Sequence, residues 1–162
     1  MEKQYIELYK SQHETIKMHS SPLMNAARDA SFGLFEELGF PTSKLENYKY
    51  TDLTETLAVD YGLNLNRVKI PVNPYEVFKC DVPGIHSYLY FVLNDGFYPV
   101  RDARNDDLPE GVVIGSLNEI SKTHPELVEA YYGKLSTTKK DGLIAFNGAF
   151  AQDGFFMYVP EN

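Results

Sequence analysis

The stretch SSPLMNAARDASFGLFEELGFP, residues 20–41, carries the clearest structural signal in the chain. Its opening, Ser20-Ser21-Pro22, supplies a capping hydroxyl and a proline for the first helical position, where the missing N–H costs nothing. At the other end, Gly39 is a typical residue for closing a helix and Pro41 blocks its continuation. Apolar residues recur at helical spacing in between, so we expect an amphipathic helix. Its expected apolar face consists of Leu23, Ala27, Ala30, Leu34 and Leu38, with Met24 and Phe35 beside it.

A weaker helical pattern precedes this stretch, from Glu2 to Met18. Tyr5, Leu8, Tyr9, Gln12 and Ile16 lie near one face of such a helix. Neither helix can bury its apolar face alone, and the two are close in sequence. We therefore expect them to pack as an N-terminal helical hairpin.

The remainder of the chain favours short mixed elements. Residues 61–80 contain Pro71 and Pro74 and are expected to form an extended connection. The strongest hairpin signal is an apolar strand over 88–93, an Asn94-Asp95-Gly96 turn and a return strand over 97–100. Further expected elements are a strand over 111–115, a helical turn from Ser116 to Ile120, a helix over 125–132, a buried helix or strand over 143–150 and a strand over 155–159.

These patterns predict an α+β fold with two parts, a helical segment over 1–60 and a small α+β portion over 61–162. The length suits about one domain, so we expect both parts to form it together. The apolar strand over 155–159 lies close to the last residue, where an uncovered edge is unfavourable. We therefore expect the natural protein to be longer, with this region as its N-terminal domain.

The segment between these parts offers capping signals and paired aromatic rings. Ser43 and Glu46 fit a capping box, and Asp52 with Glu55 repeats the arrangement. Tyr48, Lys49 and Tyr50 permit two interpretations. The rings could stack on bases or on a flat cofactor. Alternatively, they pack over the helical hairpin while Thr51 or Asp52 caps the next helix, which is the interpretation that we favour.

Composition excludes several classes of function. The charge is 15 − 23 = −8, which argues against nucleic-acid binding because that affinity depends on Lys and Arg. No apolar run approaches the ~20 residues that span a bilayer, and no export signal is visible, so we expect a cytoplasmic protein without a membrane partner. Cys80 is the single cysteine and is expected to be a small buried side chain or an incidental thiol, the alternative being a cluster ligand supplied jointly with another chain. His13, His19, His86 and His124 are scattered, so no metal site is predicted.

Catalytic signatures are also missing from the sequence. It has no phosphate-binding loop, no dinucleotide-binding glycine motif and no nucleophile elbow. Asp102, Asp106 and Asp107 are interspersed with Arg101 and Arg104, and the order does not match a calcium loop, so a solvated loop is expected. Asp95 is expected to have a structural role in the Asn94-Asp95-Gly96 turn. His124 is expected to be a helix cap or an exposed loop residue. The residues alone therefore show no catalytic signature, and they leave the function open.

Four segments nevertheless carry a likeness to a known family. Residues 39–53 resemble the pattern G-x-P-T-x-x-x-E-x-W-K/R-Y-T-D of SufD-type subunits of the SUF iron–sulfur cluster assembly system. Residues 90–97 are similar to that family's v-f-v-N-G-x-f hairpin, and 108–112 to its l-P-x-G-v step. Residues 141–154 resemble D-x-F-x-a-L-N-t-A-F-x-x-D-G, which an i-x-V-P strand follows. The order and spacing of the segments carry the resemblance.

The resemblance implies a role and not a reaction. SufD-like proteins are scaffold subunits that pair with SufB-like subunits and an ABC-type ATPase, SufC, and their centre is a β-helix that would begin where this chain stops. It implies no catalytic, metal or cofactor residue here, the iron–sulfur cluster belonging to the full complex. The motif residues with a structural or interface role would be Pro41, Glu46, Tyr48, Tyr50, Thr51, Asp52, Asn147, Phe150 and Gly154.

The chain departs from the family pattern at several positions. Tyr48 replaces Trp, Gly142-Leu143 replaces x-F, and Gly148 replaces a frequent Thr. We expect these changes to be conservative in packing. Two alternatives to a scaffold stay open from the residues: a flat-cofactor domain or enzyme that uses Tyr48 and Tyr50 with Asp52 or His124, and an iron carrier whose ligands converge from distant segments.

Overall fold

Helix α3 (Pro22–Leu38) begins and ends where the sequence predicts. In the computed structural model, Ser21 Oγ accepts a hydrogen bond from the backbone N of Met24 at 3.2 Å, and Pro22 is the first helical residue. Gly39 adopts a φ of +63°, which favours glycine, and its N–H donates to Phe35 O. The bounds of the central helix therefore follow from its local caps.

The buried face of α3 differs from the predicted one. The buried positions are Met24, Arg28, Phe32 and Phe35, whereas Ala30 and Leu38, both expected inside, are exposed. The reason is Arg28, which is 1% exposed although it carries a charge. A pattern built on apolar residues alone cannot include an arginine, so the expected face is rotated from the buried one: Met24 and Phe35, expected beside the face, are fully buried. Leu23, Ala27 and Leu34 of the expected face are half-buried.

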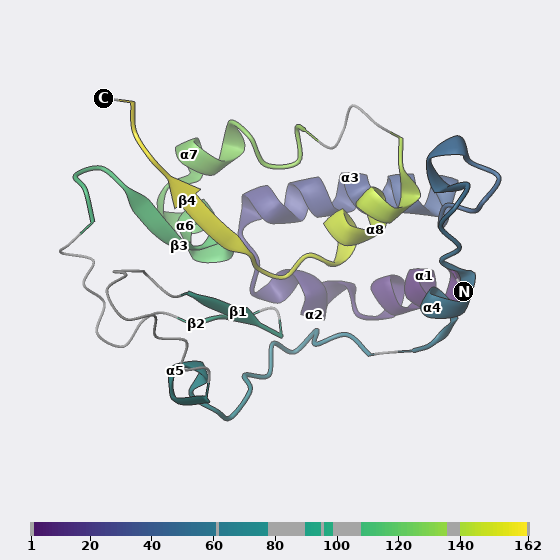
Figure 1. The fold of residues 1–162 in the computed structure, drawn as a ribbon, viewed down its shortest axis with the longest axis horizontal. Coiled ribbons are helices and arrows are strands. Elements are labelled where there is room, and N and C mark those ends of the chain that lie inside the picture. Colours follow the sequence, from purple (N-terminus) through teal and green to yellow (C-terminus); the bar gives the residue numbers. More distant parts are fainter. Residues whose placement is uncertain are drawn as a thin grey trace.

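The predicted helical hairpin is confirmed. Helices α1 (Glu2–Ser11) and α2 (His13–Met18), separated at Gln12, lie along one side of α3 (Figure 1). The rings of Tyr9 and Phe32 stack between them, with centroids 3.8 Å apart and planes inclined by 10°. At the rim, Lys10 forms an ion pair with Glu36 at 2.6 Å. The aromatic positions of the first helix are thus its core contacts.

A further helix, α8 (Gly142–Phe150), packs against α3, which resolves the helix-or-strand alternative in favour of the helix (Figure 1). Its glycines allow a close approach to α3. A Cβ on Gly148 would lie 2.5 Å from Ser31 Oγ, and one on Gly142 would lie 2.9 Å from the carbonyl carbon of Gly39. The expectation that the Gly148 departure from the family pattern is conservative in packing is therefore wrong, because neither glycine site has room for a side chain. The core comprises Tyr5, Tyr9, Ile16, Phe32, Phe35, Phe40, Leu65, Ala145, Ala149 and Phe150.

Two small antiparallel sheets lie at the end of the molecule away from the N-terminus (Figure 1). Strands β1 (Phe91–Leu93) and β2 (Gly96–Tyr98) form the predicted hairpin, with Leu93 opposite Gly96 and Asn94 at a φ of +49°. Strands β3 (Val113–Ser116) and β4 (Phe155–Tyr158) pair so that Ile114 lies opposite Met157. The α+β prediction is confirmed.

The connecting elements are short. Helix α6 (Leu117–Thr123) starts at the predicted cap, where Ser116 Oγ accepts from Glu119 N at 3.1 Å. The others are η1 (Glu46–Tyr48), α4 (Thr54–Ala58), α5 (Pro74–Val77) and α7 (Pro125–Glu129). The expected extended connection over 61–80 thus contains a helical turn, which Pro74 starts because proline suits a first helical position.

The structure describes residues 2–60, 62–77, 90–94, 96–98, 108–135 and 140–161. The predictions for Cys80, His86, Asp95 and the Asp102–Asp107 segment with Arg101 and Arg104, and for the outer ends of the 88–93 and 97–100 strands, lie outside these residues. Within them, no helix combines the length and apolar character that crossing a membrane requires.

Candidate functional site

Tyr48 connects two of the segments that the sequence analysis singled out. Its Oη donates a hydrogen bond to Asp141 Oδ2 at 2.7 Å. The other carboxylate oxygen, Asp141 Oδ1, accepts from the backbone N of Leu143 at 2.9 Å and of Ile144 at 3.1 Å, which caps α8. The hydrogen bond to Asp141 and then burial raise the pKa of Tyr48. One carboxylate therefore joins the 39–53 segment to the start of α8.

Replacing Tyr48 by Phe is expected to lower the free energy of unfolding by about 1 kcal/mol, because it removes one hydrogen bond to a charged acceptor. Urea denaturation at pH 7 measures the change. Tyr50→Phe is the matched control, since Tyr50 is 92% exposed and its loss of a hydroxyl should leave the midpoint unchanged. Equal midpoints for Tyr48→Phe and the parent would show that water replaces the Asp141 contact at no cost.

The predicted capping boxes do not form. Glu46 begins η1, whose N-cap position, Leu45, makes no side-chain cap. The segment closes as a single tight turn, with Tyr48 N donating to Leu45 O at 2.9 Å, and this leaves no helical first turn for Ser43 and Glu46 to bracket. Asp52 instead accepts from the backbone N of Thr54 at 2.9 Å. Hydrogen bonding with the Thr54 side chain, and then with the Thr54 backbone, lowers the pKa of the Asp52 carboxyl. Asp52 thus supports the start of α4 without Glu55.

The residues of the flat-cofactor alternative are not brought together. Tyr48 donates to Asp141, and Tyr50 points to solvent with Lys49 Nζ 5.5 Å from its ring centroid. Asp52 accepts from the backbone N of Thr54. His124 ends α6, where its Nδ1 lies 2.9 Å from Thr123 Oγ1. An open groove of about 450 Å³ lies elsewhere, lined by residues 70–75 and Tyr98. It includes none of the four side chains.

The other motif residues have mostly local roles. Pro41 is buried, and Phe150 is 8% exposed within the core. Thr51 N donates to Tyr48 O at 2.9 Å, and Gly154 O accepts from Leu117 N at 2.9 Å. Asn147 is exposed on α8, where its carbonyl accepts from Ala151 N. Pro41, Phe150 and Gly154 thus contribute to packing or to chain direction.

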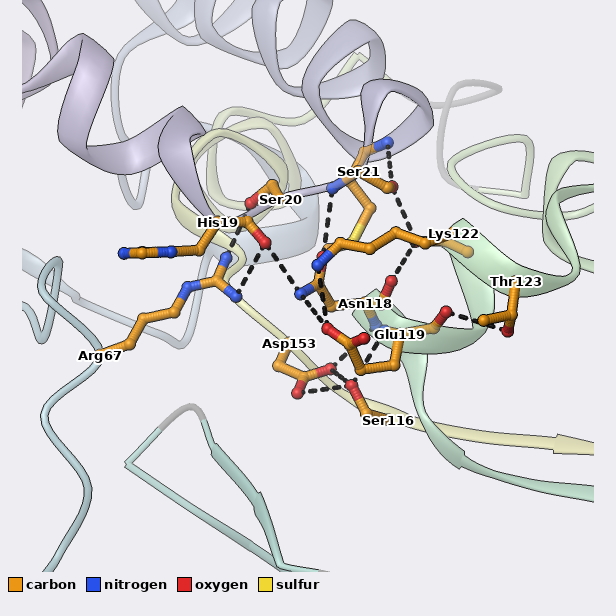
Figure 2. Close-up of polar contacts among 12 residues, drawn as sticks. His19, Ser20, Ser21, Arg67, Ser116, Asn118, Glu119, Lys122, Thr123 and Asp153 are labelled. Atoms are coloured by element: carbon orange, nitrogen blue, oxygen red, sulfur yellow. Dashed lines mark hydrogen bonds and ion pairs between the residues drawn. The ribbon is translucent and has the colours of Figure 1, made fainter.

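A polar junction that the sequence analysis missed lies at the turn between α2 and α3. Figure 2 shows the Asn118 amide between this turn and α6. Its Oδ1 accepts from Ser21 N at 3.1 Å and its Nδ2 donates to His19 O at 3.0 Å. Ser121 Oγ donates to Ser21 Oγ at 2.7 Å. Partners about a hundred residues apart leave no local pattern, so only the Ser-Ser-Pro cap was visible beforehand.

Asp153 joins the two strands of the second sheet to this junction (Figure 2). Its carboxylate accepts from Ser116 Oγ at 2.8 and 2.9 Å and from Asn118 N at 3.0 Å. It also accepts from Gly154 N at 2.8 Å. One side chain therefore fixes the corner between β3 and α6 against the start of β4.

Two arginines complete the junction from its other side. Arg28 Nη2 and Arg67 Nη2 both donate to Ser20 Oγ, at 2.9 and 2.7 Å. Arg28 Nη1 also donates to Ala149 O at 2.9 Å, which ties α3 to the end of α8. Burial of the guanidinium lowers the pKa of Arg28 and is the largest cause of that shift. The junction therefore contains two positive groups that meet at one hydroxyl.

The last strand is covered on one face only. Phe155, Met157 and Val159 are 48%, 55% and 60% exposed and alternate with the less exposed Phe156 and Tyr158. Alternation of this kind places the first three side chains on the same face. Pairing with β3 therefore covers one edge of the predicted apolar strand, while one of its faces points to solvent.

Metal ligands do not gather in the part of the chain that the structure describes: no group of three His, Cys, Asp or Glu side chains there could hold an ion. His13 approaches two carboxylates, that of Glu14 at 3.4 Å and that of Asp29 at 3.6 Å. Asp29 also accepts hydrogen bonds from Tyr9 and Lys17. That cluster joins α1 and α2 to α3.

Comparison with known proteins shows which proteins this chain is similar to. A family model described as the SufBD protein N-terminal region matches residues 1–162. An iron–sulfur cluster assembly SufBD family protein of Synechocystis is 27% identical over 138 residues, which cover 83% of this chain and 29% of the relative. A chloroplastic protein of the same description from Arabidopsis thaliana is 33% identical over 52 residues, 32% of this chain and 9% of the relative. The chain thus spans less than a third of the length of these relatives. No solved structure matches it.

Proposed function

The chain belongs to the SufBD family, whose N-terminal region it matches over residues 1–162, and from this membership we propose that it is a non-catalytic scaffold or accessory domain in iron–sulfur cluster assembly. The match along the whole chain is the observation that carries the proposal. The polar groups of the junction support it, because they bind one another and the backbone and so hold elements together. The candidate residues Tyr48 and Asp52 are engaged in the same way.

The proposed mode of action is protein–protein contact within a complex of SufB-like and SufC-like subunits in the cytoplasm. Family membership supports a place in that system, and the relatives' names describe cluster assembly. This region would position the longer protein and would hold no cofactor of its own, with the iron–sulfur cluster carried by the whole complex. The net charge of −8 is consistent with partners other than nucleic acid.

Co-purification tests the proposal. The natural protein that carries this region is tagged and co-expressed with the SufB-like and SufC-like subunits of its own organism, and both are expected to elute with it in fixed ratio. An ABC-type ATPase from another system of that organism is the control for non-specific capture. Recovery of the tagged protein without either subunit, or with the control ATPase in equal amount, would contradict a scaffold role.

A further inference from the structure

The segment between Pro41 and Leu65 is an outer piece of chain, and we call its residues 42–60 the strap. Pro41 and Leu65 are buried, whereas no residue of the strap is buried. Its side chains are exposed except for three that are half-buried, those of Tyr48, Leu53 and Leu57. The strap runs from the end of α3 past the start of α8 to α4 (Figure 1). It therefore crosses the end of the molecule without entering the core.

The hydrogen bonds of the strap are almost all internal. Tyr48 N donates to Leu45 O and Leu57 N donates to Leu53 O, both at 2.9 Å. In the part of the chain that the structure describes, one hydrogen bond connects the strap to another element. This is the bond from Tyr48 Oη to Asp141 Oδ2, at 2.7 Å. The strap thus has a single polar attachment, near its middle.

Apolar packing attaches the far end of the strap. Leu57 in α4 is half-buried and packs against the core. The other large apolar side chains contribute less, because Leu45, Tyr50 and Val59 are 54%, 92% and 50% exposed. Segments with few buried apolar contacts and with solvent-exposed backbone hydrogen bonds open at a lower free energy than the core does. The strap has both properties.

The helices beside the strap are held together without it. Tyr9 of α1 stacks on Phe32 of α3, and Arg28 Nη1 of α3 donates to Ala149 O of α8 at 2.9 Å. Asp141 caps α8 through Oδ1, whereas Tyr48 binds Oδ2. Release of Tyr48 therefore preserves both the helix packing and the cap of α8.

We propose that the strap opens from the rest of the fold as one unit while α1, α3 and α8 stay packed, with the Tyr48–Asp141 hydrogen bond as its latch. Pro41 anchors one end of the movement, since it is buried. Just beyond the other end, Gly62 adopts a φ of +68°, a region in which glycine is unstrained and can serve as a hinge. The latch lies between these two points.

Opening changes the surface of the molecule. Leu53 and Leu57, half-buried in the closed form, become exposed together with Leu45 and Tyr50. The core beside Leu57 loses its cover at the same time. The device is independent of the proposed scaffold role, because it is measured on this chain without partner subunits, so either can fail while the other holds.

Amide hydrogen exchange of the full chain, followed residue by residue by NMR, tests the opening. Thr51 and Leu57 are expected to share one protection factor, well below those of α3. Tyr48→Phe should speed exchange at both by the same factor of about five, which corresponds to the loss of one hydrogen bond. Tyr50→Phe is the matched control, since this ring is exposed, and should leave both rates unchanged. No acceleration at Leu57, or protection equal to that of α3, would overturn the proposal.

Cysteine labelling gives a second reading that depends on the side chain. In a Cys80→Ser background, Leu57→Cys places a thiol at a half-buried position of the strap. Its labelling should also be about five times faster when Tyr48→Phe is added. Val59→Cys is the control, because this position is already 50% exposed and should be labelled at the same rate with and without the latch. Equal rates for Leu57→Cys in both backgrounds would contradict an opening that the latch controls.

Discussion

Replacing Gly142 by alanine is expected to lower the Tm by about 6–12 °C, from a loss of about 3 kcal/mol of stability. The added Cβ would overlap the carbonyl oxygen of Gly39 and lie 2.9 Å from its carbon. Both atoms belong to the backbone, so no side-chain rotation relieves the overlap. Gly39 is itself fixed at a φ of +63° where α3 ends, so the start of α8 must move away from the core.

Gly33→Ala is the matched control for this change. Gly33 also lies within a helix, but a Cβ there would meet no atom within 4 Å. Alanine at that position should raise the Tm slightly, because it reduces the freedom of the unfolded chain and favours the helix. Circular-dichroism melts of both variants measure the difference. Equal Tm values would show that α8 and the end of α3 separate at little cost.

Replacing Asp153 by alanine is expected to lower the free energy of unfolding by about 2 kcal/mol. The change removes the carboxylate that accepts from Ser116 Oγ, Asn118 N and Gly154 N. Hydrogen bonds to charged groups contribute about 1.5–3 kcal/mol each, and water replaces part of that at a partly exposed site. Urea denaturation measures the loss.

Asp52→Ala provides the comparison for Asp153. Asp52 also accepts a hydrogen bond from a backbone N–H, but it lies on an exposed turn and its carboxylate holds only the local chain. Replacing Asp52 should lower the free energy of unfolding much less than replacing Asp153. Asp153→Asn, which keeps an acceptor oxygen, should have a free energy of unfolding between those of the parent and Asp153→Ala. If Asp153→Ala lowers the free energy of unfolding no more than Asp52→Ala does, Asp153 does not link β3, α6 and β4.

Local signals predicted the bounds of several elements. Ser21, Pro22 and Gly39 fix the ends of α3 through contacts within a few residues, and Ser116 does the same for α6. The hairpin of β1 and β2 followed from its turn residues. Each of these depends on the chemistry of neighbouring residues, which the sequence displays directly.

Long-range contacts could not be predicted in the same way. Arg28 is buried because Ala149 and Ser20 provide its acceptors, and neither is visible from the helical pattern of α3. The capping box at Ser43–Glu46 fits the local pattern, yet the segment forms a tight turn and Tyr48 reaches Asp141 instead. The need for glycine at position 148 becomes visible only in the structure, where Gly148 packs against Ser31.

The position of α8 in the chain has a consequence for biosynthesis. The aromatic faces of α1 and α3 leave the ribosome first, but the helix that covers them, Gly142–Phe150, emerges roughly a hundred residues later. At about 5–20 residues per second, that interval lasts some seconds. During this time Tyr9, Phe32 and Phe35 are without their final cover, so the nascent chain should depend on chaperones until α8 has been translated.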